Sequence, residues 1–505
     1  MNIENLSQSI VDSGYEVAFG ITGSGMSFKL INDLVSKGVS YFTVSNESAA
    51  AIAAGAYSYH FRSKALAISI KGPGFANLLA GITACHLENF DFLAISEEYD
   101  DSVSTQVKHK RINQQTMIEE VTRKRASLCT ESLFEFLNDQ NSFAPRYFSL
   151  SNKKIDCKEV NQELREMSNE VFDDILSRLN ACKKPLLVIG SELYRLKLEN
   201  LLDIIQIPVM TTVQAKGSFD EFKTNSFGVY TGVGKNAVPE NELIAAADLV
   251  LSIGLKNEEI LDIKAKSSFI NVDLTPSESD SFTHKCSISN LNQFLDVLKN
   301  KQSWGAELKD KYNRIQETIF ENNDWLPFQV FKQLDLYNAK STMVLDTGFF
   351  CTVGEHYYRA NSKKRFLGSS NGRNMGLSVP MCLGIALKGE PVFCCFGDGG
   401  VRYHLGEVRT IAELNLPVCF ILFTDGRYGS VVSYLGIKDS NPKLTQPFGT
   451  SWGKTFTSFG VKSFVAKNAF DFKKILDDWD SINPIYIEAP FDPELYSKMT
   501  LEIRE

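Results

Sequence analysis

The chain has 505 residues, of which 43% are hydrophobic and 23% charged, and its formal net charge is -8. This length is enough for two to four domains, and the acidic balance disfavours nonspecific nucleic-acid binding, which needs a basic surface. No apolar run reaches the ~18 residues of a membrane span, and the amphipathic, acidic N-terminus is not typical of a signal peptide. The ten cysteines are scattered without CxxC pairs or zinc-type spacing, which favours a reducing cytoplasm over disulfides or a zinc site.

Apolar, strand-like runs alternate with helix-length amphipathic segments along most of the chain. In chain order the runs are EVAFGI (16–21), ALAISI (65–70), PLLVIG (185–190), LVLSIG (249–254), SFINVD (268–273), TMVLD (342–346), PVFCCF (391–396) and PVCFILF (417–423). This alternation predicts an α/β fold of buried parallel strands with crossover helices. Polar, helix-rich stretches at 151–184 and 300–325 predict connections between three doubly wound domains, at residues 1–160, 170–300 and 320–505.

Near the N-terminus, a glycine-containing loop and a glutamate follow predicted strands. The segment FGITGSG could be a dinucleotide loop, but it lacks the GxGxxG spacing and an acid about 20 residues further on. Glu47 stands at a strand end, directly before the alanine-rich helix AAAIAAGAY. From the residues alone, Glu47 is either a functional carboxylate or an acid that the helix dipole favours.

Two acids follow neighbouring strands in the C-terminal third. Gly397-Asp398-Gly399-Gly400 comes directly after PVFCCF, and Thr424-Asp425 follows PVCFILF, with one predicted helix between them. Ligands of open parallel sheets bind at the carboxyl ends of the strands, where the glycines and the helix N-terminus favour a phosphate. Carboxylates beside a phosphate suit Mg²⁺. The alternative is that both acids are ordinary loop residues.

These segments, in this order and spacing, resemble the thiamine-diphosphate enzymes of the acetolactate synthase and pyruvate decarboxylase superfamily over nearly the whole chain. The resemblance implies pyrimidine-binding, middle Rossmann-like and diphosphate-binding domains in that order. It also implies that Mg²⁺ is bound by Asp398, Asp425 and the carbonyl of Arg427. The sequence departs from the family because Thr424-Asp425 replaces Asn-Asn, which adds a negative charge, and Gly400 replaces the usual Ser.

The resemblance assigns roles to further residues. Glu47 would be catalytic and share a proton with N1′ of the cofactor's aminopyrimidine. The Arg373 carbonyl would accept from the 4′-amino group, and Met375 would support the bent cofactor, unless it is plain core filler. Lys71 precedes Gly72-Pro73-Gly74 where the family has Ser or Thr, and Thr22 replaces a Pro. The other expected cofactor-binding residues are Gly23, Pro73, Asn77, Gly397, Asp398, Gly399, Gly400, Asp425, Tyr428 and Gly429.

The type of reaction is inferred from missing acids. Simple decarboxylases of the family carry Asp, a His-His pair and Glu where this chain has Ser24, His109-Lys110 and Val431. Since those acids protonate the acyl carbanion, their absence favours its transfer to a second carbonyl. Tyr434 stands where acetolactate synthases have Trp, and it either contacts the acceptor or packs on a helix face. The candidate substrate residues are Ser24, Gly25, Gln114, Val431 and Tyr434.

We therefore expect a carboligase that depends on thiamine diphosphate and Mg²⁺, decarboxylates a 2-oxo acid, expected to be pyruvate, and transfers the acyl carbanion to a second carbonyl. The alternatives are a non-ligating decarboxylase and an inactive, cofactor-binding scaffold. We expect no FAD, because LKNEEIL after LVLSIG lacks the acidic-Arg stretch that accompanies it. The resemblance further implies a homodimer or a dimer of dimers, a homotetramer, with each site between two chains.

Overall fold

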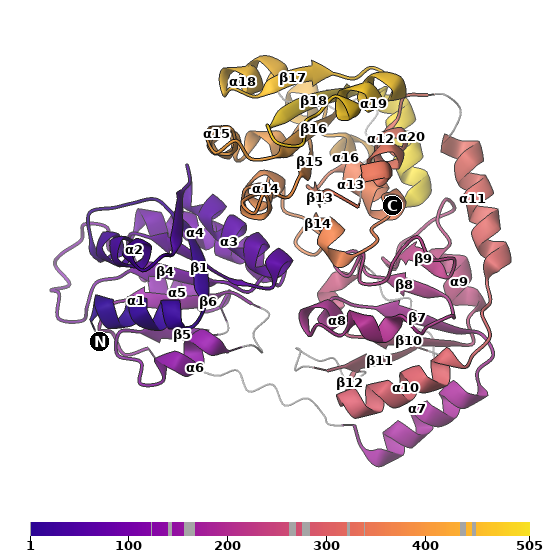
Figure 1. Cartoon of the computed structure of the whole chain (residues 1–505), viewed down its shortest axis with the longest axis horizontal. Helices are drawn as coiled ribbons and strands as arrows, with labels where there is room; N and C mark the ends of the chain where they lie inside the picture. Colours follow the sequence, from indigo (N-terminus) through magenta and orange to yellow (C-terminus); the bar gives the residue numbers. More distant parts are fainter. Residues whose placement is uncertain are drawn as a thin grey trace.

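The computed structural model describes residues 2–122, 124–139, 144–155, 167–261, 269–274, 283–320, 324–337, 339–434, 441–446 and 451–504. It contains three six-stranded sheets, which lie within residues 15–150, 185–285 and 342–490 (Figure 1). Across the described part of the chain, no helix is long and apolar enough to cross a membrane. The α/β fold expected from the sequence is confirmed, and each of the eight predicted strands is found within one residue at either end.

The N-terminal sheet has the strand order β2-β1-β3-β4-β6-β5, and all of its pairs are parallel. Its strands are β1 (Tyr15–Gly20), β2 (Ser40–Thr43), β3 (Lys64–Ser69), β4 (Leu93–Glu97), β5 (Lys124–Ser127) and β6 (Arg146–Leu150). Its helices are α1 (Ile3–Asp12), α2 (Met26–Ser36), α3 (Glu47–Phe61), α4 (Pro73–Leu87), α5 (Gln114–Ile118) and α6 (Leu133–Asn138).

The middle sheet has the order β12-β11-β10-β7-β8-β9, again parallel, which is the strand order of a dinucleotide-binding fold. Its strands are β7 (Pro185–Ile189), β8 (Val209–Thr211), β9 (Ser226–Val229), β10 (Leu249–Ile253), β11 (Phe269–Asp273) and β12 (Thr283–Lys285). The associated helices are α7 (Asn169–Ala181), α8 (Glu192–Arg195), α9 (Glu240–Ala246), α10 (Ile288–Lys299) and α11 (Ala306–Phe320), with 3₁₀ turns at Glu199–Leu202 and Asn257–Glu259.

The C-terminal sheet repeats the topology of the first, with the order β14-β13-β15-β16-β18-β17. Its parallel strands are β13 (Thr342–Leu345), β14 (Phe366–Gly368), β15 (Val392–Gly397), β16 (Val418–Thr424), β17 (Lys462–Val465) and β18 (Ile485–Pro490). Its helices are α12 (Pro327–Leu334), α13 (Phe349–Tyr357), α14 (Ser378–Ala386), α15 (Leu405–Glu413), α16 (Gly429–Tyr434), α17 (Pro442–Thr445), α18 (Trp452–Ser458), α19 (Ala469–Asp477) and α20 (Pro493–Ile503), with 3₁₀ turns at Asp335–Tyr337, Lys363–Arg365 and Gly400–Arg402.

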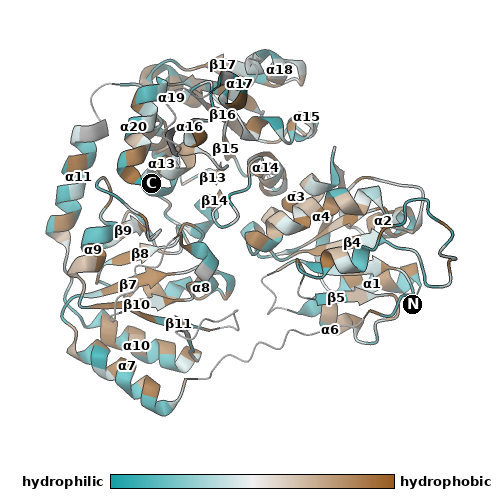
Figure 2. Ribbon diagram, turned by 180° about the vertical axis from the view of Figure 1, so that it is seen from behind, coloured by the Kyte–Doolittle hydropathy of each residue, from teal (hydrophilic) through white to brown (hydrophobic). Residues whose placement is uncertain are grey.

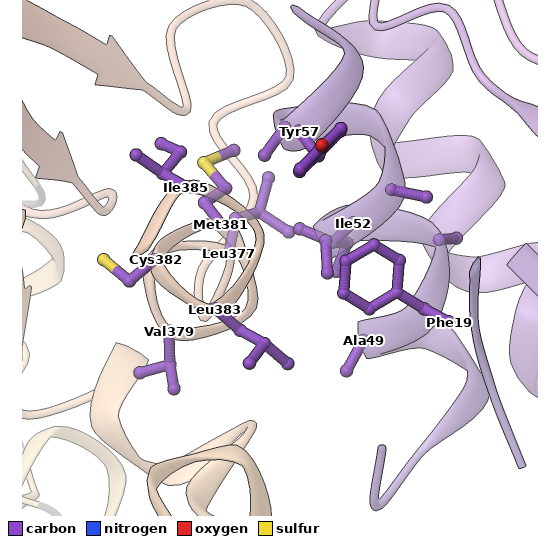
Figure 3. Close-up of a cluster of buried hydrophobic side chains, with 14 of the residues drawn as sticks. Phe19, Ala49, Ile52, Tyr57, Leu377, Val379, Met381, Cys382, Leu383 and Ile385 are labelled. Carbon is purple, nitrogen blue, oxygen red and sulfur yellow. The ribbon is translucent and has the colours of Figure 1, made fainter. Parts of the chain in front are cut away.

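One apolar cluster joins the N-terminal and C-terminal domains through α3 and α14. Figure 3 shows Leu377 and Leu383 on the side that faces Ile52 of α3. Small residues allow the two helices to approach closely, because a side chain at Gly384 would overlap the carbonyl oxygen of Ala53. The helix that begins at Glu47 is therefore fixed against the domain that carries Asp398.

The apolar residues of the middle domain are concentrated in its strands. In Figure 2, β7, β8 and β10 are brown, whereas α7, α10 and α11 carry teal, polar surface. The buried pattern of β7 and β10 is continuous, as expected for strands covered by helices on both faces.

Candidate active site

Glu47 is the first residue of α3 and is buried, with 8% of its surface exposed. Asn46 caps the helix by accepting from the Ser48 amide at 2.8 Å, which fixes the start of the helix at Glu47. The Asn77 side-chain amide donates to Glu47 Oε2 at 3.0 Å. A Cβ atom at Gly74 would lie 3.1 Å from Glu47 Oε1. The Gly72-Pro73-Gly74 loop and α4 therefore hold the carboxylate from one side.

Gln114 fixes the other end of that loop. Its Oε1 accepts from the Gly72 amide at 3.0 Å, and its Nε2 donates to Ser96 Oγ, to the Glu97 carbonyl and to the Tyr147 hydroxyl at 2.9–3.0 Å. The side chain is 1% exposed, so its amide is fully engaged within the domain. The substrate role expected for Gln114 stays a prediction, and the observed contacts are those of a residue that positions the loop.

Lys71, the departure from the family's Ser or Thr, forms an ion pair with Glu97 at 2.9 Å. Glu97 Oε1 also accepts from the Ser27 amide at 2.8 Å. Burial acts to raise the pKa of Glu97, but Lys71 and Ser27 outweigh it and hold the pKa below its ordinary value. A side chain at Gly25 would overlap the Glu97 carboxylate, and one at Gly23 would overlap Ile70. The loop that contains Ser24 is therefore packed against this ion pair.

The Gly397–Gly400 segment forms a turn at the carboxyl end of β15, as predicted. A Cβ at Gly399 would lie 3.1 Å from both Met375 Sδ and the Tyr428 ring, and one at Gly400 would lie 2.7 Å from Asp346 Oδ2. The glycines thus leave a backbone cradle that a side chain would fill. A Ser at position 400, as in the family's pattern, would require the Asp346 carboxylate to move.

Asp398 and Asp425 lie together at this edge of the sheet. The Thr424 hydroxyl donates to both oxygens of Asp398, at 2.8 and 2.9 Å. Burial raises the pKa of Asp398 to about 6; the Thr424 hydroxyl opposes the rise and the Asp425 carboxylate adds to it. Two buried carboxylates at close range repel each other, and a cation between them relieves that repulsion.

Arg427 compensates the negative charge that Asp425 adds. Its Nε lies 3.1 Å from Asp425 Oδ2, and its Nη2 donates to the Pro493 carbonyl at 2.8 Å. Burial raises the pKa of Asp425, and Arg427 opposes that rise. Gly429 is needed beside them, since a Cβ there would lie 2.8 Å from Asp425 Oδ2.

The segment before α14 positions the two residues expected beneath the cofactor. Met375 is 39% exposed, although it packs on Gly399, so it is not core filler. Arg373 has φ +49 and forms an ion pair with Glu355. Although burial opposes it, the neighbouring Arg373 and Arg504 guanidinium groups lower the pKa of Glu355 to about 2. The backbone of Arg373 is thus fixed through its side chain.

Glu88 is a residue that sequence reasoning missed. It is fully buried in the N-terminal domain, yet its carboxylate accepts from the amides of Ser370, Asn371 and Gly372 of the C-terminal domain at 3.0–3.2 Å. Burial raises its pKa, and these backbone bonds oppose the rise. Glu88 therefore holds the loop that leads to Arg373.

A second cross-domain contact lies beside Glu47. Ser48 Oγ lies 3.1 Å from His404 Nε2, and His404 Nδ1 lies 2.7 Å from the Gly376 carbonyl. Ser45 donates its hydroxyl to Glu407 at 2.5 Å. The start of α3 is therefore attached to the segment that follows the glycine cradle.

The two remaining candidate substrate residues lie on α16. Val431 is 45% exposed. Tyr434 ends the helix, and its side chain lies outside the described residues.

The residues fit the cofactor and metal that the resemblance implies. Within the described ranges, no cluster of three or more His, Cys, Asp or Glu side chains could hold a metal alone. Two carboxylates, a backbone carbonyl and ligand phosphates are the mixed oxygen set that Mg²⁺ prefers. Asp398 and Asp425 supply the carboxylates, Arg427 has a carbonyl at the expected position, and the glycine cradle leaves space for the phosphates.

Comparison with known protein families shows which family the chain belongs to. Three family models match in order: "Thiamine pyrophosphate enzyme, N-terminal TPP binding domain" at residues 3–117, the central domain at 172–298, and the C-terminal TPP binding domain at 346–488. Together they cover most of the chain, which belongs to the thiamine pyrophosphate enzyme family.

The chain is similar to acetolactate synthases over most of its length. A probable acetolactate synthase large subunit of Methanococcus aeolicus is 22% identical over 95% of this chain and 90% of that protein. The acetolactate synthase of Bacillus subtilis (strain 168) is 21% identical over 96% and 92%. The acetolactate synthase large subunit of Porphyra purpurea is 23% identical over 86% and 82%.

Proposed function

We propose that this protein is a thiamine-diphosphate- and Mg²⁺-dependent carboligase. A 2-oxo acid, pyruvate in the simplest case, loses CO₂, and the acyl carbanion left behind forms a carbon–carbon bond with the carbonyl carbon of a second molecule. The oxygen of that carbonyl takes up one proton and becomes a hydroxyl. The supporting observation is the pairing of a buried Glu47, held by Asn77, with a glycine cradle that carries Asp398 and Asp425.

The proposed roles fall on residues at the edges of two sheets. When bound, thiamine diphosphate supplies the electron sink for the carbanion. Glu47 exchanges a proton at Oε1, because Oε2 is occupied by Asn77. Asp398, Asp425 and the Arg427 carbonyl would hold the metal, while Arg427 itself offsets one carboxylate. Met375 and the Gly399 backbone, which lie side by side, would help to position the cofactor.

Ligation is favoured over simple decarboxylation because the acids that the family's decarboxylases use are replaced. Ser24, His109-Lys110 and Val431 stand where those enzymes carry Asp, a His-His pair and Glu. Without these acids the acyl carbanion is protonated more slowly and is available for longer to a second carbonyl. Mass spectrometry of the products from pyruvate tests this: acetolactate supports ligation, whereas acetaldehyde alone, with every acceptor offered, would contradict it.

The proposal includes a cytoplasmic homodimer or dimer of dimers. Both domains that carry the proposed site expose large apolar side chains, among them Phe28 and Met117 in the N-terminal domain and Met375, Tyr403 and Val431 in the C-terminal domain. A second copy of the chain would cover them. If Glu47 of one chain completes the cradle of another, then co-expressed Glu47→Gln and Asp398→Asn chains regain about a quarter of wild-type activity. If each site instead lies within one chain, the co-expressed variants regain no activity.

A further inference from the structure

A pocket of about 370 Å³ lies beside the Gly72 loop. Its lining includes four cationic side chains, Lys108, Lys110, Arg111 and Lys153, and one acid, Glu98. The formal charge of this basic pocket is therefore +4 - 1 = +3, in a chain whose net charge is -8. The positive charge is a local feature and does not reflect the composition of the chain.

Two of the cations are available to a ligand. Glu98 is buried and is paired with Lys153 at 2.7 Å. Lys108 and Lys110 are exposed, and neither forms an ion pair with any residue that the structure describes. An anion that enters the pocket would therefore meet two ammonium groups whose charges are not already compensated.

The loop that carries these lysines makes contacts with itself and with Tyr99, which stands two residues after β4. Arg111 donates from Nε to the Val107 carbonyl at 2.8 Å, and its guanidinium lies 4.7 Å from the centre of the Tyr99 ring. The Tyr99 hydroxyl donates to the His109 carbonyl at 2.8 Å. These contacts give the loop a defined course along the pocket.

The basic pocket is separated from Glu47 by one short loop. The backbone of Lys110 packs directly on Gly72, where a Cβ would overlap its carbonyl oxygen. Gly74, two residues further on, contacts Glu47, and two residues span at most about 7 Å. The pocket and Glu47 therefore both adjoin the same short Gly72–Gly74 segment, which is the geometric link between them.

We infer that the basic pocket binds the phosphate group of a phosphorylated aldehyde or ketone, which is the acceptor of the acyl group. This inference rests on the proposed function and adds the class of acceptor to it. The new bond forms at the acceptor's carbonyl carbon, the carbonyl oxygen takes up a proton, and the phosphate is unchanged. A net charge of +3 matches a phosphate dianion better than a single carboxylate, and lysine and arginine are its usual partners.

Matched acceptors test the inference on the holoenzyme. Pyruvate is the donor, and glyceraldehyde is compared with glyceraldehyde 3-phosphate as acceptor. We expect kcat/KM to be at least about tenfold higher for the phosphorylated acceptor, as two charge-assisted contacts imply. In the Lys108→Gln/Lys110→Gln variant this ratio falls toward one. The control variant Lys183→Gln/Lys184→Gln, which removes two adjacent exposed lysines from the middle domain, keeps the wild-type ratio.

The results that overturn the inference are defined separately from those that overturn the proposed function. The inference is wrong if the ratio of kcat/KM values for the phosphorylated and unphosphorylated acceptors is near one in the wild type. It is also wrong if K108Q/K110Q leaves that ratio unchanged. Preference for a carboxylate-bearing aldehyde, succinic semialdehyde, over the phosphorylated acceptor also contradicts it. Failure of the proposed function would instead appear as no Glu47-dependent CO₂ release with any acceptor, or as release that yields acetaldehyde alone with every acceptor.

Direct binding gives a readout that does not depend on turnover. Inorganic phosphate is titrated with the holoenzyme and followed by ³¹P NMR. We expect line broadening with the wild type and with K183Q/K184Q, and its loss with K108Q/K110Q. Broadening that is absent from the wild type, or equal in all three proteins, would overturn the inference.

Discussion

Asn77 donates its side-chain amide to Glu47 Oε2 at 3.0 Å, and so joins α4 to the first residue of α3. Glu47 Oε1 lies beside Gly74, and the proposed function assigns proton exchange to this oxygen. We predict that Asn77→Leu lowers kcat by about 10- to 100-fold, because a hydrogen bond to a charged group contributes about 1.5–3 kcal/mol.

The Asn77→Asp variant distinguishes orientation from charge. An aspartate at position 77 cannot donate to Glu47 Oε2 and adds a negative charge beside it, whereas a leucine only removes the donor. We therefore expect Asn77→Asp to lower kcat/KM more than Asn77→Leu, as measured by steady-state kinetics. Equal losses in the two variants would show that only the lost hydrogen bond matters.

Asp398 is expected to be required for binding the metal and the cofactor. Replacing it with Asn removes one charged oxygen ligand but keeps the shape that Thr424 contacts. We predict that Asp398→Asn weakens the Mg²⁺-dependent binding of thiamine diphosphate by at least about 100-fold, above the 10- to 100-fold typical of outer-shell partners. Calorimetric titration measures this directly, with the exposed Asp310→Asn as the matched control. Similar affinities in both variants would contradict the assignment.

Glu88 is expected to hold the 369–372 loop. In Glu88→Gln one carboxylate oxygen is replaced by an NH₂ group, which cannot accept from the backbone N–H groups of the loop. Each buried N–H group left without an acceptor costs about 1–3 kcal/mol of stability. We predict a lower melting temperature and faster amide hydrogen exchange across 369–375, read by mass spectrometry. The exposed Glu307→Gln is the control. Unchanged exchange in this loop would rule out the role assigned to Glu88.

The buried carboxyl group of Glu259 is expected to make the stability of the folded protein depend on pH. It accepts from the Ser191 amide and from the Thr212 hydroxyl, and burial raises its pKa from 4.5 to about 7. Between these values the unfolded chain has lost the proton that the folded chain keeps, so stability falls as pH rises, by up to about 1.4 kcal/mol per pH unit.

Thermal melts compare the wild type with Glu259→Gln, which cannot titrate. We expect the melting temperature of the wild type to fall relative to that of the variant from pH 4.5 to 7 and to change little above pH 7. A difference that stays constant across this range would mean that Glu259 is ionised in the folded protein.

The features that could be predicted from the sequence are those set by residues close together along the chain. The eight strands follow from continuous apolar runs, and the turn at Asp398 follows from glycines placed directly after β15. Glu47 was found because a strand end and an alanine-rich helix flank it. These features are local, so composition and spacing are enough to locate them.

Contacts between distant segments could not be predicted in this way. Glu88 bonds to residues more than 280 positions later, and nothing in HLENFDF distinguishes it from a surface acid. The substrate role of Gln114 stays a prediction, but the bond from its amide to the Gly72 loop could not be predicted. The space at Gly400 is set by Asp346, which appears in the sequence only as the last residue of an apolar run.

The most direct test of the proposed function is CO₂ release from pyruvate by the purified protein with thiamine diphosphate and Mg²⁺, in the wild type and in Glu47→Gln. Cofactor binding is measured on the same samples. The proposal predicts that the wild type releases CO₂ and that Glu47→Gln binds the cofactor but releases at least about 100-fold less, as loss of general acid–base catalysis implies. Equal CO₂ release by both proteins would contradict it, and so would no release by a wild type that has bound its cofactor, with pyruvate and with a panel of other 2-oxo acids.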